Sequence, residues 1–177
     1  MKKLLYWSIA ILILTGLIIY GFTSAPKVIR LDRHIEVTAY KLQDTSFAKP
    51  VTLALKGAFD EKSESYVGKL GINDIEYSYC SLSPEVGFMN CALEAVWLPF
   101  SGRVYANKDF SQWSLEVPQQ TYEANDTTND LYNSLNQGST THDTIIISIP
   151  ATDRESAVKL YQRLQKDWSD NLQRKHR

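Results

Sequence analysis

The sequence contains few of the residues from which catalytic and metal sites are commonly built. It has two cysteines and three histidines in 177 residues. The histidines are His34, His142 and His176, and none lies at metal-ligand spacing from another histidine, a cysteine or a glutamate. Glycine-rich phosphate loops, nucleophile-elbow motifs and paired-carboxylate motifs are also lacking. We therefore expect no metal site and no cofactor.

The chain also lacks an excess of either charge. Its formal net charge is -1 at pH 7, and 22% of its residues are charged while 44% are hydrophobic. This balance does not indicate a basic surface for nucleic acid, and the hydrophobic fraction is too high for a disordered chain. The composition is typical of one folded domain, and we do not expect nucleic acid as a partner.

One long stretch has no charged residue at all. As a helix, the nineteen residues from Leu4 to Phe22 would be about 28 Å long, which matches the hydrocarbon thickness of a bilayer. The stretch therefore predicts a transmembrane helix that anchors the protein in the plasma membrane, with the lipid bilayer as its partner. Large side chains occur along the whole anchor, at Leu4, Trp7, Ile11, Leu14, Ile18 and Phe22.

A cleaved signal peptide, and hence a secreted protein, is the alternative interpretation of this stretch. Lys2 and Lys3 supply the positive charges that precede a signal peptide. However, the apolar run exceeds the roughly 7 to 15 residues of a signal peptide, and Pro26 follows the small residues Thr23–Ala25. Because the two lysines abut the run and later cations are farther from it, we expect a cytoplasmic N-terminus. We predict an uncleaved, single-pass signal-anchor with the folded domain outside.

The rest of the chain has the patterns of a single β-rich domain. We expect a membrane anchor over residues 1–25, a juxtamembrane linker over 26–34 and an extracytoplasmic domain over 35–172. Within this domain, residues 119–143 are polar and irregular, which predicts a long loop. Residues 173–177 form a basic tail. The expected fold class is mainly β (α+β), an antiparallel meander sheet or small barrel with a C-terminal amphipathic helix packed on it.

Alternation of apolar and polar residues predicts the strands. Apolar residues recur at every second position from Ile35 to Ala39 and from Val51 to Phe59. Further short strands are predicted at Val104–Ala106, Trp113–Val117 and Ile145–Ile149. Two hairpins lie between the second and third of these segments.

The first hairpin is predicted to turn at Asn73-Asp74, two residues that tolerate a positive φ. Pairing Ile72 with Ile75 places Gly68 opposite Tyr79 and gathers the apolar residues on one face. We expect that face to be core, and its alternative role is to bind an apolar ligand or a partner protein. It comprises Tyr66, Leu70, Ile72, Ile75, Tyr77 and Tyr79.

The second hairpin places the two cysteines opposite each other. If Pro84–Gly87 is a four-residue loop, Ser83 faces Phe88 and Cys80 faces Cys91. Directly opposite residues have Cβ atoms about 4.5 to 5.5 Å apart, close to the roughly 3.8 Å of a disulfide. We predict a disulfide between these cysteines, which an oxidising surface would preserve. The alternative is two buried thiols.

A helix is predicted over residues 153–170. Thr152 and Glu155 have the spacing of a capping box, in which each side chain satisfies a free amide at the helix start. Apolar residues then recur at helical spacing, which predicts that one side of the helix packs on the sheet. These residues are Ala157, Leu160, Tyr161, Leu164 and Trp168.

The N-terminal anchor and three strand-and-turn segments resemble those of small, uncharacterised single-pass membrane-anchored proteins of Gram-positive bacteria. The segments are the strand from Val51 to Phe59, Gly68–Tyr77, and Gly102–Tyr105 with the following Asp109-Phe110. The likeness covers about half of the chain. It implies a β-rich extracytoplasmic domain and transfers no catalytic residue.

One enzyme hypothesis also arises from the sequence. Sortases are membrane-anchored β-barrel transpeptidases that use a histidine, a nucleophilic cysteine and an arginine in that chain order, and His34, Cys91 and Arg103 follow it. However, Phe88–Asn90 replaces the Thr-Leu-x-Thr that precedes the sortase cysteine, and His34 lies too near the anchor. We therefore favour a membrane-tethered extracytoplasmic binding or scaffold domain without catalytic activity, whose partner is a protein or cell-envelope component. A sortase-like cysteine transpeptidase is the alternative.

Overall fold

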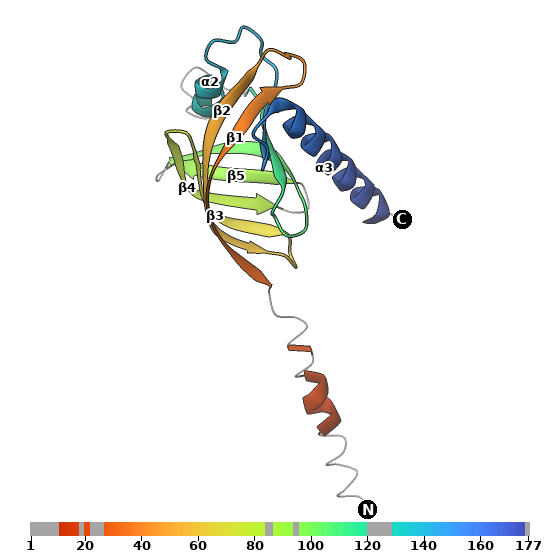
Figure 1. The fold of residues 1–177 in the computed structure, drawn as a ribbon. Helices are drawn as coiled ribbons and strands as arrows, with labels where there is room; N and C mark the ends of the chain where they lie inside the picture. Colours follow the sequence, from red (N-terminus) through yellow and green to blue (C-terminus); the bar gives the residue numbers. More distant parts are fainter. Residues whose placement is uncertain are drawn as a thin grey trace, which may run out of the picture.

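The fold is an eight-stranded antiparallel barrel with one long helix against its wall. The computed structural model describes residues 11–17, 20–21, 27–83, 87–93, 96–119 and 129–175. The strands follow one another around a closed barrel in the order in which they occur along the chain. Figure 1 shows the barrel, with the C-terminal helix α3 (Arg154–Lys175) along one side. Of the two predicted arrangements, a meander sheet or a small barrel, the structure contains the barrel.

All the strands predicted from alternation are present. The short helix α2 (Asn129–Asn136) precedes the last strand, and α3 follows it. The strands are β1 (Val28–Lys41), β2 (Ala48–Asp60), β3 (Ser65–Ile72), β4 (Ile75–Ser83), β5 (Phe88–Leu93), β6 (Val96–Ala106), β7 (Trp113–Val117) and β8 (Ile145–Ile149).

The barrel closes where the first strand meets the last. β1 and β2 share thirteen residue pairs, from Val28 with Asp60 to Tyr40 with Ala48. By contrast, β1 and β8 share only three pairs, at positions 39–41 of β1. The Thr38 amide continues this seam by donating to the Ala151 carbonyl at 3.0 Å. Closure thus depends on a short stretch of pairing, because β8 pairs only with positions 39–41 of the fourteen-residue β1.

A pair of glycines makes room for an inward aromatic ring. Gly57 and Gly68 lie opposite each other on β2 and β3, and the Tyr66 ring covers both. A Cβ atom added to Gly68 would lie 2.5 Å from the Tyr66 hydroxyl oxygen. That hydroxyl donates to the Lys69 carbonyl at 2.7 Å. The absence of side chains at both glycines thus lets Tyr66 join the core.

The turn at Asn73-Asp74 is confirmed, but the pairing changes further along the same hairpin. A bulge between Gly68 and Leu70 places Gly68 opposite Cys80 rather than Tyr79. Tyr79 is consequently 53% exposed, so the prediction that it shares the core face is wrong. The same bulge turns Cys80 inwards, where it is fully buried.

The second hairpin has the predicted register, with Ser83 opposite Phe88 and Cys80 opposite Cys91. Cys80 and Cys91 form a disulfide that joins β4 to β5. Both residues are buried and face the core. The predicted disulfide is therefore confirmed, and the alternative of two free thiols is not what the structure contains.

Helix α3 packs its apolar side on the outer wall of the barrel. Tyr40 of β1, Tyr105 of β6 and Ile146 of β8 are buried beneath it. The predicted docking is confirmed. The helix contributes buried side chains at Ala157, Leu160, Tyr161 and Leu164, with Trp168 partly buried beside them.

A buried polar network fixes the position of this helix. The Tyr40 hydroxyl donates to the Ala157 carbonyl at 3.1 Å and lies 3.4 Å from the Ser148 hydroxyl. Ser148 is in turn hydrogen-bonded to Ser114 at 2.8 Å, and neither serine is exposed. Burial raises the pKa of Tyr40 to about 12. Because a buried hydroxyl without a partner is costly, the network favours one helix position over others.

The start of α3 differs from the predicted capping box. Asp153, not Thr152, accepts the Ser156 amide at 2.9 Å, and Thr152 is exposed. This hydrogen bond is the main cause that lowers the pKa of Asp153. Glu155 instead pairs with Lys159 at 2.6 Å on the helix surface. An aspartate is a strong N-cap residue, and it takes the role one position later than predicted.

Three predicted boundaries also change. β1 begins at Val28, so most of the linker predicted over 26–34 is strand, with charged residues on its outer face. The polar segment 119–143 contains α2, which uses the few apolar residues of that segment. Helix α3 extends to Lys175, five residues beyond its predicted end, and residues 176–177 of the predicted tail lie outside the described residues.

The structure describes only part of the predicted anchor. Residues 11–17 and 20–21 are helical, and Ile11 and Leu14 are 60% and 61% exposed. No helix within the described ranges combines the length and apolar character needed to cross a membrane. The other anchor residues, Leu4, Trp7, Ile18 and Phe22, lie outside the described residues.

Truncating the buried face of α3 tests its docking. Leu164 is 3% exposed, so Leu164→Ala should lower the free energy of unfolding by about 2 to 5 kcal/mol, as expected for a core cavity. Lys166→Ala, on the exposed face of the same helix, is the matched control and should change it by less than about 0.5 kcal/mol. Thermal or denaturant unfolding measures both, and equal effects would contradict the docking.

Removing the disulfide tests its contribution to stability. The cysteines are 11 residues apart, and closing a loop of this size stabilises a fold by roughly 3 kcal/mol in the chain-entropy model. Replacing both Cys80 and Cys91 by alanine should therefore lower the free energy of unfolding by about that amount. Wild-type protein unfolded with reductant is the control, because it loses the bond without losing side-chain volume. Alkylation before reduction should label no thiol, and labelled cysteines would refute the bond.

Candidate functional site

Stacked aromatic rings fill the barrel interior near its lower end in Figure 1. We call this end, with its turn 61–64 and its loop 107–112, the lower rim. Phe110 from the loop 107–112 is fully buried and stacks on Phe59 and Trp113 at centroid distances of 4.7 and 5.2 Å. The Tyr66 ring also stacks on Phe110, at a centroid distance of 5.7 Å. Phe110 has a φ of 53°, a conformation that side-chain-bearing residues rarely adopt, which shows how firmly this packing holds the loop.

Helix α2 fills the opposite end of the barrel, which we call the upper mouth. Leu131, Tyr132 and Leu135 of α2 are buried and join the barrel core together with Phe47. The Tyr132 hydroxyl donates to the Asp143 carbonyl at 3.0 Å. The protein's own side chains therefore occupy the interior at both ends. Apart from Tyr79, the aromatic face considered for an apolar ligand is part of this core.

The one charged residue that is fully buried among the described residues is Lys41, at the upper mouth. Its ammonium donates to the Asn136 side chain at 2.5 Å, to the Ser139 hydroxyl at 3.0 Å and to the Thr141 carbonyl at 2.6 Å. Burial lowers the pKa of Lys41, and the carboxylate of Asp143 partly offsets this effect. The ammonium thus ties the end of β1 to the segment that follows α2.

Lys49 strengthens the same attachment. Its ammonium donates to the Leu135 carbonyl at 3.1 Å and to the Gln137 carbonyl, where α2 ends. The free carbonyls of a helix C-terminus carry partial negative charge and attract cations. Lys41 and Lys49 also lie over the Phe47 ring, at 4.8 and 5.3 Å from its centroid. The two lysines therefore hold α2 in the upper mouth.

The wall opposite α3 carries a groove of about 400 Å³ on the outer face of β1, β2, β3 and β4. Its floor is formed by Ala54 and Gly71, which lie opposite each other on β2 and β3. A Cβ atom on Gly71 would lie 3.2 Å from the Ala54 Cβ. The absence of a side chain at Gly71 therefore leaves the space above the two residues open. Polar residues surround this floor: Asp32, Arg33, His34, Lys56, Lys69, Asn73, Asp74 and Glu76.

The groove carries positive and negative groups side by side, with Lys56 directly opposite Asp32 on the neighbouring strand. Lys56 and Lys69 lie directly opposite each other, an arrangement that is unfavourable unless an anion lies nearby. Lys69 pairs with Glu76 at 3.8 Å, whereas Lys56 has no ion pair with any described residue. Asp32 and Asp74 add carboxylates at two sides. The arrangement suits a polar ligand that carries both acidic and basic groups.

A second cleft, of about 420 Å³, lies between α3 and the segment before β8. There the Tyr161 hydroxyl donates to Glu116 at 2.6 Å and accepts from Gln165 at 3.1 Å. Burial is the main cause that raises the pKa of Tyr161, and the Glu116 hydrogen bond raises it further. His142 and Asp143 line the cleft as well. Because Tyr161 and Glu116 satisfy each other, this pair contributes to helix docking.

The residues of the sortase-like hypothesis do not come together. His34 is exposed and lines the groove, whereas Cys91 is buried in the core and disulfide-bonded. Arg103 lies on the outer wall, 5.1 Å from the centroid of Phe88 and 6.0 Å from that of Trp168. A disulfide-bonded cysteine has no thiolate for nucleophilic attack. The geometry gives this hypothesis no support.

Sequence reasoning missed both Lys41 and the groove. Lys41 continues the inward alternation of Val37 and Ala39, so its position already indicated a buried ammonium. The groove floor combines Ala54 with Gly71, and recognising it required the register between β2 and β3. The available signal for the groove was a small residue on the outer face of each of two predicted strands, Ala54 and Gly71.

No family model, curated protein or solved structure matches this chain. Within the described ranges, no three histidine, cysteine, aspartate or glutamate side chains lie close enough to hold a metal ion. The expected lack of a cofactor stays a prediction. The function is therefore inferred from the residues themselves.

Proposed function

We propose that the protein is a membrane-tethered, extracytoplasmic binding or scaffold domain without catalytic activity, and that its partner binds in the groove on β1–β4. The observation that carries this proposal is the filled barrel. Its own aromatic and aliphatic side chains occupy the lower end and α2 occupies the upper mouth. Since α3 covers one side of the wall, recognition falls to the uncovered side, where the groove lies.

The N-terminal stretch supports the tether. Leu12 and Leu17 are 72% and 62% exposed, and the other large residues of 11–17 are similarly uncovered. A helix that is apolar on all sides requires an apolar surrounding. The uncharged run from Leu4 to Phe22 is long enough for that surrounding to be a bilayer. We propose that this helix crosses the plasma membrane once and anchors the protein there.

The groove supports binding rather than catalysis. Its acidic and basic groups are exposed and lie on neighbouring strands, so they can recognise a partner of complementary charge. The partner is a protein or cell-envelope component that carries both carboxylate or phosphate groups and amines. Nucleic acid does not fit, because the net charge is -1 and the groove balances its three cations with three carboxylates.

Cysteine labelling tests the membrane topology. The native cysteines are disulfide-bonded, so a single introduced cysteine reports its own location. A membrane-impermeant maleimide should label Lys166→Cys on intact cells, whereas Lys3→Cys should react only after lysis. The reverse pattern would invert the orientation. Loss of the residues before Pro26 from the mature protein would show cleavage and remove the anchor.

Photo-crosslinking tests the groove. A benzoylphenylalanine at position 54, on the groove floor, should give a discrete adduct on cells, and the same probe at position 166 on α3 should not. Lys56→Glu with Lys69→Glu should reduce the adduct by about tenfold, since exposed ion pairs contribute up to about 1 kcal/mol each. Lys62→Glu with Lys108→Glu, at the lower rim, is the matched control and should leave it unchanged. Equal adducts from positions 54 and 166 would refute the groove as the binding site.

A further inference from the structure

The chain enters the barrel at a fixed point on the lower rim. The Lys27 amide donates to Asp60 at 3.2 Å, and the Lys27 carbonyl accepts from the Glu61 amide at 3.0 Å. The Lys27 ammonium also pairs with Glu61. Val28 then begins β1 opposite Asp60. Three contacts thus fix Lys27 to the turn between β2 and β3.

Little chain separates this fixed point from the proposed anchor. Only residues 23–26 lie between Phe22 and Lys27. Five extended residue steps span at most about 18 Å. By comparison, β2 has 13 residues and would be roughly 43 Å long if straight. In an upright barrel, the tether therefore lets the end of β2 at Asp60 lie at the membrane surface, but not the end at Ala48.

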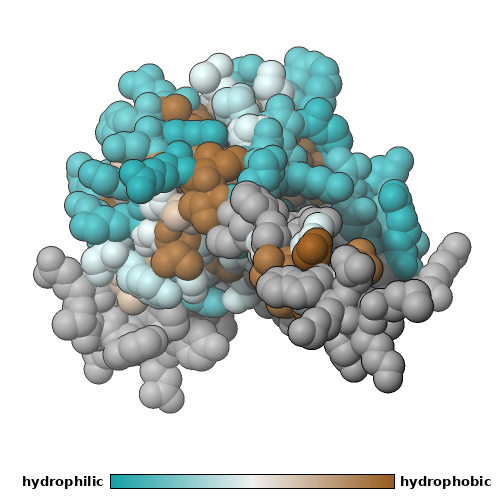
Figure 2. Space-filling view, turned by 90° about the horizontal axis from the view of Figure 1, so that it is seen from below, coloured by the Kyte–Doolittle hydropathy of each residue, from teal (hydrophilic) through white to brown (hydrophobic). Residues whose placement is uncertain are grey.

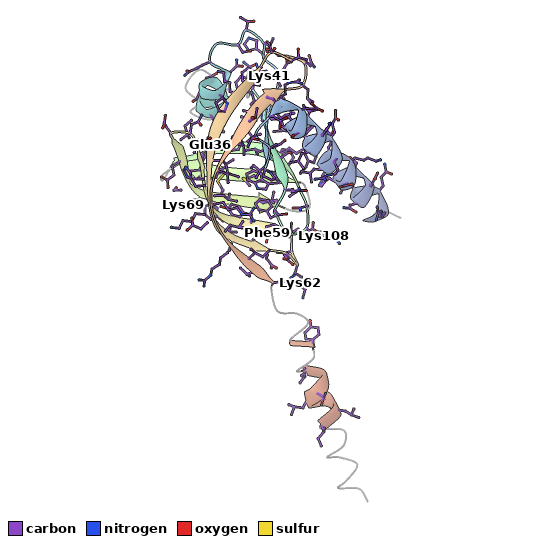
Figure 3. All side chains as sticks on the ribbon, viewed as in Figure 1. Glu36, Lys41, Phe59, Lys62, Lys69 and Lys108 are labelled. Atoms are coloured by element: carbon purple, nitrogen blue, oxygen red, sulfur yellow. A yellow bond between two sulfur atoms is a disulfide. The ribbon has the colours of Figure 1, made fainter. Side chains whose placement is uncertain are left out.

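Figure 3 shows which side chains share the end where the chain enters. Lys62 and Lys108 are labelled at the end of the barrel from which the N-terminal segment leaves, whereas Lys41 is labelled at the opposite end. Lys62 belongs to the turn between β2 and β3, and Lys108 to the loop between β6 and β7. These two positions therefore report on the lower rim from two separate loops of the chain.

The lower rim has no net attraction to acidic lipid. In Figure 2, which views the molecule from below, hydrophilic residues surround hydrophobic ones on the coloured part of the surface. The described rim contains three cations and four anions, a net charge of 3 − 4 = -1. Its charged residues are Lys27, Lys62, Lys108, Asp60, Glu61, Glu64 and Asp109.

We infer that the lower rim is a membrane-facing surface, held against zwitterionic lipid headgroups by the short tether and not by lipid charge. This inference rests on the proposed anchor. In this arrangement the upper mouth with α2 faces away from the membrane, and the groove on β1–β4 opens to the side. The groove is then accessible to a partner in the same membrane or in the adjacent envelope.

Spin labels on the full-length protein in phosphatidylcholine liposomes test the inference. Single cysteines replace Lys62 or Lys108 at the rim, and Thr45 in the exposed upper loop is the control position. A lipid with a nickel-chelating headgroup relaxes only nearby labels. We expect relaxation several-fold greater at positions 62 and 108 than at position 45. Replacing part of the lipid by phosphatidylglycerol should not increase it.

A longer tether provides the decisive variant. Inserting about ten Gly/Ser residues after Thr23 adds flexible reach, so relaxation at the rim should fall towards the value at position 45 while the protein still floats with the liposomes. If the protein without the insertion floats with the liposomes but shows equal relaxation at positions 45, 62 and 108, the inference is wrong and the anchor still holds. Failure of the unmodified chain to float would refute the anchor itself, and the inference with it.

Discussion

Closure of the barrel depends on the short seam between β1 and β8. Helices α2 and α3 both form hydrogen bonds with residues of that seam. Three residue pairs join the two strands, and each backbone hydrogen bond contributes only about 1 kcal/mol net. On the outside, Tyr40 and the Lys41 carbonyl bond to α3, through the Ala157 carbonyl and the Arg154 guanidinium. On the inside, the Lys41 ammonium binds the segment after α2. The weakest pairing of the barrel is therefore stabilised from both faces.

This arrangement divides the barrel wall into two parts with different roles. The part beneath α3 carries buried hydroxyls and aromatic rings, and its hydrogen-bonding groups are satisfied by the helix. The part formed by β1–β4 keeps its outer face in solvent, and its small residues Ala54 and Gly71 leave a hollow between charged neighbours. Because residues such as Phe110 and Leu135 occupy the interior, the hollows open to solvent lie on the outside, in this groove and in the cleft beside α3.

Local patterns predicted much of this fold, and the misses arise from distant packing. The Cys80–Cys91 pair followed from counting outward across one hairpin, since nothing outside that hairpin changes its register. Tyr79 was misplaced because the bulge beside it lies next to the Gly57 and Gly68 pair, whose packing involves another strand. The groove was missed for a similar reason, because its floor depends on how β2 pairs with β3.

The seam also has a consequence for the order of folding during synthesis. Tyr40 contacts Ser148 and Ala157, 108 and 117 residues later in the chain. A chain that emerges N-terminus first therefore exposes one edge of β1 until nearly its whole length is available. Contacts of such long range slow folding, and an open edge invites pairing with other chains. The outer residues Arg30, Asp32 and Glu36 place charges along that strand, which discourages wrong pairing while the edge is open.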